Sequence, residues 1–219
     1  LEEQAKGPIL NPVEMAMPTE DSVVSLLKSI PGYPPLFAVA FPDDSDPVTY
    51  NNMAIAIGAF ERGLVTPSAF DEYLAGDSSR LSPAARTGLE KFVSLGCVTC
   101  HNGPAFGGGL YRQLGQVHAY STSDVGRFAV TGEETDRRVF KVPALRNVTQ
   151  TGPWFHDGSV TELDEAIRLM GWHQLGIEIE PGDRAQLIVF LETLEGQPDS
   201  AYIAMPAVLE SGPDTPGPE

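Results

Sequence analysis

Apolar residues recur every three or four positions in several segments of the chain, which is the spacing of an amphipathic α-helix. The segments with this pattern cover residues 19–30, 49–63, 82–95, 161–170 and 182–195, with a shorter helical turn at 69–75. Strict alternation of apolar and polar residues, the pattern of a half-buried strand, is weak throughout. The sequence therefore predicts a mainly α-helical fold with little sheet.

Residues with special backbone preferences mark the ends of these helices. A helix should start at Thr19, with two acidic residues in its first turn, and stop at the sequence PGYPP. Ser82 suits the cap of a later helix, with Pro83 at its first position, and Gly96 permits the left-handed turn that ends it. Thr161 is the expected cap of the helix that runs to Met170.

Three segments lack helical periodicity. Residues 1–18 are interrupted by glycine and proline, and we expect them to be irregular. Residues 102–160 are rich in glycine, proline and threonine and predict a long loop region, which in a compact domain usually surrounds something or carries function. The ending SGPDTPGPE is proline-rich and predicts a loose tail.

Composition narrows the possible partners. The chain has 219 residues, of which 42% are hydrophobic, so it is long enough for one large domain or two small ones. Its formal net charge of −16 argues against nucleic acid as a partner and permits a basic protein partner, although the charge also serves solubility. No apolar run reaches the ~18 residues of a membrane span. The opening LEEQAKGPIL lacks the pattern of a signal peptide, so we expect a mature form or a fragment of a longer protein.

Both cysteines of the chain lie in the sequence GCVTCHNGP, and three interpretations compete for them. The first is a disulfide between Cys97 and Cys100. The second is a metal site, but zinc needs four ligands and the chain has one cysteine pair. The third is covalent haem attachment, in which the two thiols bond to the porphyrin edge and His101 ligates the iron. A helix before the motif and a glycine-rich loop after it favour the third interpretation.

A haem held in this way needs a second axial ligand or an open position. The candidates are Met170, His173, His156 and His118. A methionine ligand raises the reduction potential and suits electron transfer, whereas an open position suits peroxide or oxygen chemistry. Covalent haem also implies assembly outside the cytoplasm, so we expect a periplasmic location.

Several longer motifs resemble one family, the bacterial dihaem cytochrome c peroxidases, from Leu1 to about Pro198. In chain order they are EQAKGPILNPVEM, LVTPSAFDEYLAGD, GCVTCHNGPAFGG, FKVPALRNVTQTGPWFHDGS, LDEAIRLMGWHQLG and LIVFLETLEG. Members of the family carry two haems, and this chain has one CxxCH, which corresponds to the electron-transfer haem. The motif for the peroxidatic haem would lie upstream of Leu1.

The resemblance implies a domain arrangement. Residues 1–77 would be a helical remnant of the peroxidatic-haem domain with its connecting helices. Residues 78–204 would form a cytochrome c-like domain with long loops around its haem, and residues 205–219 a flexible proline-rich tail.

The resemblance also implies roles for residues. Cys97 and Cys100 match the thioether pair, and His101 and Met170 match the axial ligands of one haem c. Gln4 and Glu14 match a polar pair over the peroxidatic iron, where the glutamate moves protons as a general acid–base. Thr151 and Pro153 match positions whose backbone carbonyls hold a calcium ion, together with a ligand from the missing segment.

The expected function is that of the electron-transfer portion of a periplasmic peroxidase that reduces hydrogen peroxide to water. Its electrons would come from a small c-type cytochrome or cupredoxin, and a homodimer is expected from the resemblance. This chain alone should be nearly inactive. One alternative is a stand-alone monohaem electron carrier, which the single CxxCH favours. Another is a related dihaem enzyme that oxidises a protein, but in such relatives a tyrosine replaces the methionine at position 170.

Overall fold

The computed structural model describes residues 1–217 and divides into two compact units. The first unit comprises Leu1–Val65 and the chain from Pro198 onward, and the second comprises Thr66–Gln197. The prediction of a mainly helical protein with little sheet is confirmed. The unit boundaries differ from the predicted ones near residues 77 and 204, because Ser68 forms a β-bridge with Gly196 and Phe70 belongs to the core of the second unit. The assignment of these segments to haem domains stays a prediction.

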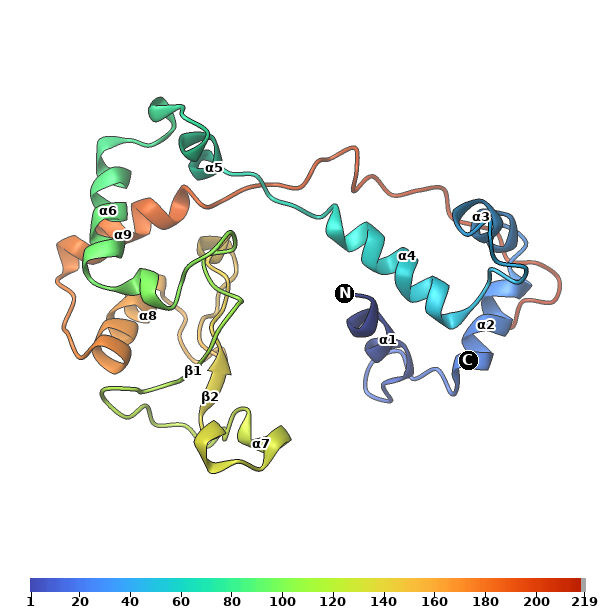
Figure 1. Ribbon diagram of the computed structural model, residues 1–219, viewed down its shortest axis with the longest axis horizontal. Helices are drawn as coiled ribbons and strands as arrows, with labels where there is room; N and C mark the ends of the chain where they lie inside the picture. Colours follow the sequence, from blue (N-terminus) through green and yellow to red (C-terminus); the bar gives the residue numbers. More distant parts are fainter. Residues whose placement is uncertain (218–219) are drawn as a thin grey trace. The chain divides into compact units, whose positions relative to one another are not determined.

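The first unit is built from four helices (Figure 1). They are α1 (Glu2–Leu10), α2 (Glu20–Ser29), α3 (Tyr33–Ala40) and α4 (Tyr50–Arg62). A small core lies between them, formed by Ile9, Val23, Phe37, Val48, Tyr50 and Met53.

The second unit holds five helices and one two-stranded ribbon (Figure 1). The helices are α5 (Ala69–Leu74), α6 (Pro83–Ser94), α7 (Phe128–Thr131), α8 (Leu163–Met170) and α9 (Pro181–Glu192), and the antiparallel strands are β1 (Tyr111–Gln113) and β2 (Val139–Lys141). Short 3-10 turns cover Ser78–Arg80, Cys97–Thr99, Glu134–Asp136 and Val148–Gln150, and a π-helical turn covers Gly171–Leu175.

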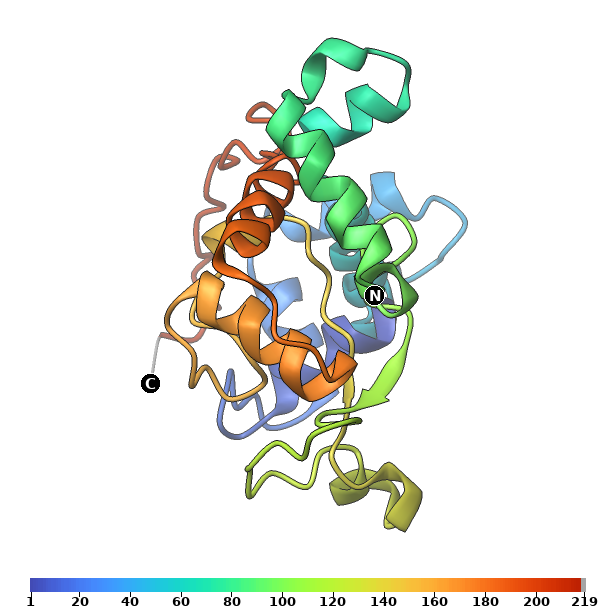
Figure 2. The same ribbon diagram turned by 90° about the vertical axis from the view of Figure 1, so that its left-hand side faces the viewer.

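The pair α6 and α9 forms the frame of the second unit. Figures 1 and 2 both show the two helices side by side, and their contact is the most extensive between any two elements. Gly88 of α6 lies at the crossing, where a Cβ atom would overlap the carbonyl oxygen of Gln186 in α9. Phe92 of α6 and Phe190 of α9 pack with their ring centroids 5.3 Å apart. These two rings belong to the core on which the loops of residues 102–160 rest.

The prediction that residues 1–18 are irregular is wrong for α1. Ala5 and Ile9 lie one turn apart on this helix and are both buried, and the Tyr50 hydroxyl donates a 2.6 Å hydrogen bond to the carbonyl of Lys6. Pro8 sits inside the helix, where proline is normally unfavourable. Packing against α4, which lies far along the chain, outweighs that local preference.

Two further elements are missing from the sequence prediction. Helix α3 begins inside PGYPP, at Tyr33, because Pro34 and Pro35 lie in its first turn, where backbone N–H groups have no helical partner in any case. The ribbon β1–β2 forms inside the predicted loop region, with Arg112 opposite Phe140. Each strand has three residues, too few for a periodic pattern to show.

The helix ends predicted from the sequence are mostly confirmed. Thr19 is the N-cap of α2, and the Ser82 side chain accepts a hydrogen bond from Ala85 N at the start of α6. Gly96 is left-handed, with φ of 94°. Thr161 is not the cap of α8, because that helix begins at Leu163 and its N-cap position is Glu162, which makes no side-chain cap hydrogen bond.

The chain from Pro198 onward packs against α2 and α4 of the first unit over its described part. Tyr202 stacks on Phe60 with ring centroids 5.3 Å apart, and the Thr215 hydroxyl donates a 2.8 Å hydrogen bond to the carbonyl of Ser29. The last two residues of the predicted tail 205–219 lie outside the described residues.

In residues 1–217, no helix taken singly has the length and apolar character needed to cross a bilayer; α2 and α3 meet both requirements as a pair, with a bend of 108° between them.

Candidate haem-binding site

The CVTCH sequence folds into a tight turn at the end of α6. Left-handed Gly96 ends the helix, and the carbonyl of Cys97 then accepts hydrogen bonds from Cys100 N at 3.2 Å and His101 N at 3.0 Å. The side-chain amide of Asn102 donates to the carbonyls of Val98 and Thr99, both at 3.2 Å. The turn therefore fixes the backbone that carries both thiols and the imidazole.

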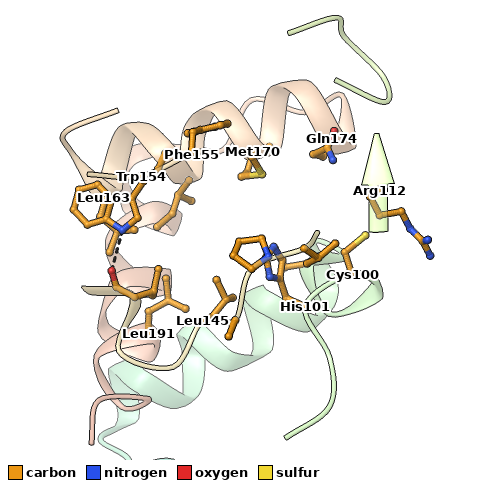
Figure 3. Close-up of a pocket in the computed structure, with 18 of the residues that line it drawn as sticks. Cys100, His101, Arg112, Leu145, Trp154, Phe155, Leu163, Met170, Gln174 and Leu191 are labelled. Carbon is orange, nitrogen blue, oxygen red and sulfur yellow. Dashed lines mark hydrogen bonds between the residues drawn. The ribbon is translucent and has the colours of Figure 1, made fainter. Parts of the chain in front are cut away.

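These side chains line a cavity of about 400 Å³ in the second unit. Cys97, Cys100 and His101 form part of one wall, and Met170 at the end of α8 faces them (Figure 3). Most of the remaining lining is apolar, including Leu145, Trp154, Phe155, Leu163, Ile167 and Leu191. A concave apolar site with a few convergent polar groups is the usual form of a cofactor pocket.

The imidazole of His101 has an unpaired nitrogen. Its Nδ1 is buried and has no hydrogen-bond partner in the described part of the chain. Burial lowers the pKa of His101, and the nearby backbone carbonyls of Phe106 and Pro143 partly oppose that effect. The two carbonyls therefore lie close to the buried imidazole. A neutral imidazole with one nitrogen turned toward carbonyls is the form that ligates metals.

The cysteines are free thiols, and burial raises the pKa of Cys97 to about 11. A thiol in this state is not an activated nucleophile, which argues against thiolate catalysis. The structure has no bond between Cys97 and Cys100, so the disulfide interpretation gains no support. No group of three or more His, Cys, Asp or Glu side chains in residues 1–217 is placed to hold a metal ion, so the zinc interpretation gains none either.

The residues present fit a covalently attached haem. The cavity offers apolar walls for the macrocycle, two thiols beside one imidazole, and a thioether on the opposite side. Of the histidine candidates for the second axial position, His156 also lines the cavity, and its Nε2 lies 3.2 Å from the Thr122 hydroxyl. His118 and His173 are absent from the lining. His118 stacks on Trp172, and His173 Nδ1 lies 2.7 Å from the His118 carbonyl.

The other predicted site residues are placed differently. Gln4 and Glu14 belong to the first unit and are exposed to solvent. Thr151 and Pro153 line the cavity, and neither of their carbonyls accepts a backbone hydrogen bond in the described part of the chain.

Sequence reasoning missed most of the cavity wall. Trp154 donates a 2.9 Å hydrogen bond from Nε1 to the carbonyl of Val148, which fixes its ring against the cavity. Gln174 accepts from the amides of Gly115 and Gln116 at 2.9 and 3.0 Å and so ties the loop after β1 to the π-helical turn. Periodicity did not single out these residues, because residues that face a cavity from a loop follow no repeat, although Trp154 and Gln174 both lie in motifs that carry the family resemblance.

The chain is similar to several known proteins. A family model described as "Di-haem cytochrome c peroxidase" matches residues 1–79. The cytochrome c551 peroxidase of Pseudomonas aeruginosa is 46% identical, over 97% of this chain and 63% of the relative. That of Nitrosomonas europaea is 44% identical, over 99% of this chain and 64% of the relative. The chain therefore spans less than two thirds of the length of these curated relatives.

Among solved structures, the crystal structure of a MauG-like protein associated with microbial copper homeostasis is similar with a TM-score of 0.79 and 26% sequence identity. The match covers 93% of this chain and 70% of that one.

Proposed function

The chain belongs to the dihaem cytochrome c peroxidase family, and from this premise we propose that it is the electron-transfer haem portion of a periplasmic peroxidase. The whole enzyme would reduce hydrogen peroxide to water with electrons from a small c-type cytochrome or cupredoxin. The observation that carries the proposal is the convergence of Cys97, Cys100, His101 and Met170 on one apolar cavity.

Each of these residues has a distinct task. Cys97 and Cys100 would anchor the porphyrin through thioether bonds, so the cofactor would not dissociate. His101 and Met170 would ligate the iron, and a His/Met ligand pair supplies a high reduction potential. When bound, the haem supplies a one-electron couple. The apolar side chains around it exclude water and keep both ligands in place.

The peroxide chemistry is assigned to the second haem of the whole enzyme. Glu14 would move the proton there as a general acid–base, with Gln4 beside it as a polar partner. Thr151 and Pro153 would hold a calcium ion through their backbone carbonyls. The acidic net charge would attract a basic electron donor, and two copies of the enzyme would form a homodimer.

The first test counts haems and identifies the iron ligands. The chain is produced with a periplasmic haem-attachment system, and the mass of the denatured protein is measured. We expect the mass of one haem bonded through two thioethers, and a low-spin spectrum of His/Met ligation. A protein that stays colourless with both thiols free would contradict the proposal.

The second test separates the peroxidase from the stand-alone carrier. We expect the one-haem chain to be reduced by a donor cytochrome yet to turn over very little peroxide, because the peroxidatic haem is assigned elsewhere. Rapid turnover by a verified one-haem sample would contradict this division. A gene product that joins a secretion signal directly to Leu1 would favour the carrier.

A further inference from the structure

We propose that Asp71 and Arg146 are a positioning pair that sets the reduction potential of the haem by holding the backbone carbonyls around His101. The inference rests on the proposed function, since it concerns the iron ligand of that site. Neither residue is a catalytic residue, because neither lines the cavity.

The pair is a two-pronged ion pair between parts of the chain that are distant in sequence. Arg146 donates from its two terminal nitrogens to the Asp71 carboxylate, at 2.8 and 2.6 Å. The same carboxylate accepts the amide and the hydroxyl of Ser68, both at 2.8 Å, at the start of α5. Ser68 is buried at 4% exposure, so one partner of the carboxylate belongs to the core.

The third donor of Arg146 reaches the loop that follows His101. Its Nε donates a 2.7 Å hydrogen bond to the carbonyl of Pro104. Next to this contact, Leu145 N donates to the carbonyl of Ala105 at 3.1 Å. Residues 104–106 and 143–146 are thereby joined side by side, with Arg146 connecting both to α5.

These two joined segments carry the carbonyls that face the imidazole. The carbonyl of Phe106 belongs to one segment and that of Pro143 to the other, and both lie close to the buried imidazole of His101, which shares the cavity wall with Pro143. The two segments also approach each other very closely. They are so close that a Cβ atom on Gly107 would overlap the Pro143 carbonyl oxygen. A carbonyl that accepts from the outer nitrogen of a ligating histidine fixes the ring and raises its donor strength. Movement of these segments would therefore change how strongly His101 binds the iron.

Arginine fits this role better than lysine. Its planar fork contacts one carboxylate through two nitrogens while a third donor remains for a carbonyl, whereas a lysine carries a single ammonium group. The Asp71–Arg146 contact is partly buried, with side-chain exposures of 35% and 24%, so solvent competes with it less than on an open surface.

The test measures the haem potential of R146Q beside that of the unaltered chain. We expect the equilibrium constant for reduction of the iron to rise ~10-fold, about 59 mV for one electron, because a less strongly held imidazole stabilises ferric iron less. The reduction potential of D71N should rise by less than that of R146Q. The reduction potential of R146K should lie between those of R146Q and the unaltered chain. The near-infrared band of Met-ligated ferric haem should persist in all three variants.

The matched control is R137Q. Arg137 makes a similar two-pronged pair with Glu134, at 2.8 and 2.8 Å, and neither residue lines the cavity. The substitution removes the same charge and the same kind of ion pair from the second unit. We expect the haem potential to stay at the value of the unaltered chain.

The outcomes distinguish this inference from the proposed function. A purely structural pair would lower the unfolding temperature of R146Q and leave the reduction equilibrium as in R137Q, and that result would overturn the inference. Amide exchange of Leu145 is measured in the same variants and needs no haem; we expect faster exchange in R146Q than in R137Q. Absence of covalent haem from the unaltered chain would contradict the proposed function. Equal amide exchange of Leu145 in R146Q and R137Q would contradict the positioning role.

Discussion

At the scale of single residues, the cavity combines a local motif with one distant side chain. Cys97, Cys100 and His101 are adjacent in sequence, and one turn of backbone presents them together. Met170 comes from another helix, and α8 places it opposite His101 (Figure 3). A thioether ligand on one side and an imidazole on the other favours a high potential. The proposed role of Met170 as an iron ligand can therefore be tested separately from haem attachment.

Substitution M170A should leave the haem covalently attached and open the sixth position of the iron. We expect the potential to fall by on the order of 100 mV, because the thioether ligand raises it. The band of Met-ligated ferric haem should disappear, and added cyanide should bind. Met205, 84% exposed, provides the control variant M205A, which should keep the spectrum. An unchanged spectrum in M170A would show that another residue, such as His156, ligates the iron.

Asp71 gives a second prediction at the residue scale. Hydrogen bonds from Arg146 hold the pKa of the Asp71 carboxyl well below its usual value of 3.8. A carboxyl with a lowered pKa stabilises the folded state above its unfolded pKa, and this contribution is lost as pH falls through the folded value. The difference in unfolding free energy between the unaltered chain and D71N should therefore be constant near neutral pH and shrink below about pH 4. Urea unfolding at several pH values measures it, and a difference that does not change with pH would contradict the role of the charge.

At the scale of elements, the second unit depends on how closely α6 and α9 approach each other. Gly88 has no side chain at the crossing, and the rings of Phe92 and Phe190 fill the space beside it. This packing positions the start of the CVTCH turn, which follows α6 directly. The packing of α6 against α9 therefore fixes the position of the cysteine motif.

Substitution G88A should destabilise the protein although alanine favours helix. The added Cβ would overlap the Gln186 carbonyl oxygen and lie 2.8 Å from Phe190 Cβ. Overpacking costs about 1–3 kcal/mol, which outweighs the gain of about 1 kcal/mol in helix propensity when backbone atoms must move. The control is G182A on α9, where a Cβ would meet nothing within 4 Å and stability should hold or rise. Equal unfolding temperatures for the two variants would show that the helices can separate freely.

At the scale of the whole molecule, charge is the property that no single site explains. The formal net charge of −16 comes from 30 acidic residues against 14 lysines and arginines. Such a field increases the encounter rate with a positively charged partner and is weakened by salt. Electron donors with a basic surface would therefore be selected by long-range attraction.

The rate of electron transfer from a basic cytochrome should fall steeply as salt is added, by about 10-fold between low and physiological ionic strength. Stopped-flow reduction of the haem-loaded chain measures this rate. A small uncharged reductant is the control and should show little dependence on salt. If the rate of haem reduction depends equally on salt for both reductants, the proposed attraction is contradicted.

The sequence by itself determined the features that depend on neighbouring residues. The helices at 49–63 and 82–95 follow from apolar periodicity and from the cap at Ser82, and the CVTCH motif contains its chemistry within five adjacent residues. The family resemblance, confirmed by the comparisons, also came from short contiguous motifs. In each case the determining interactions lie within one or two turns of backbone.

The tertiary structure alone decided what depends on distant partners. Helix α1 forms because Tyr50 and α4 pack against it, despite Pro8. The pairing of Asp71 with Arg146 joins residues 75 positions apart, and no motif predicted it. No local pattern encodes such contacts, because they exist only once the two helices α6 and α9 have packed and the loops have closed around the cavity.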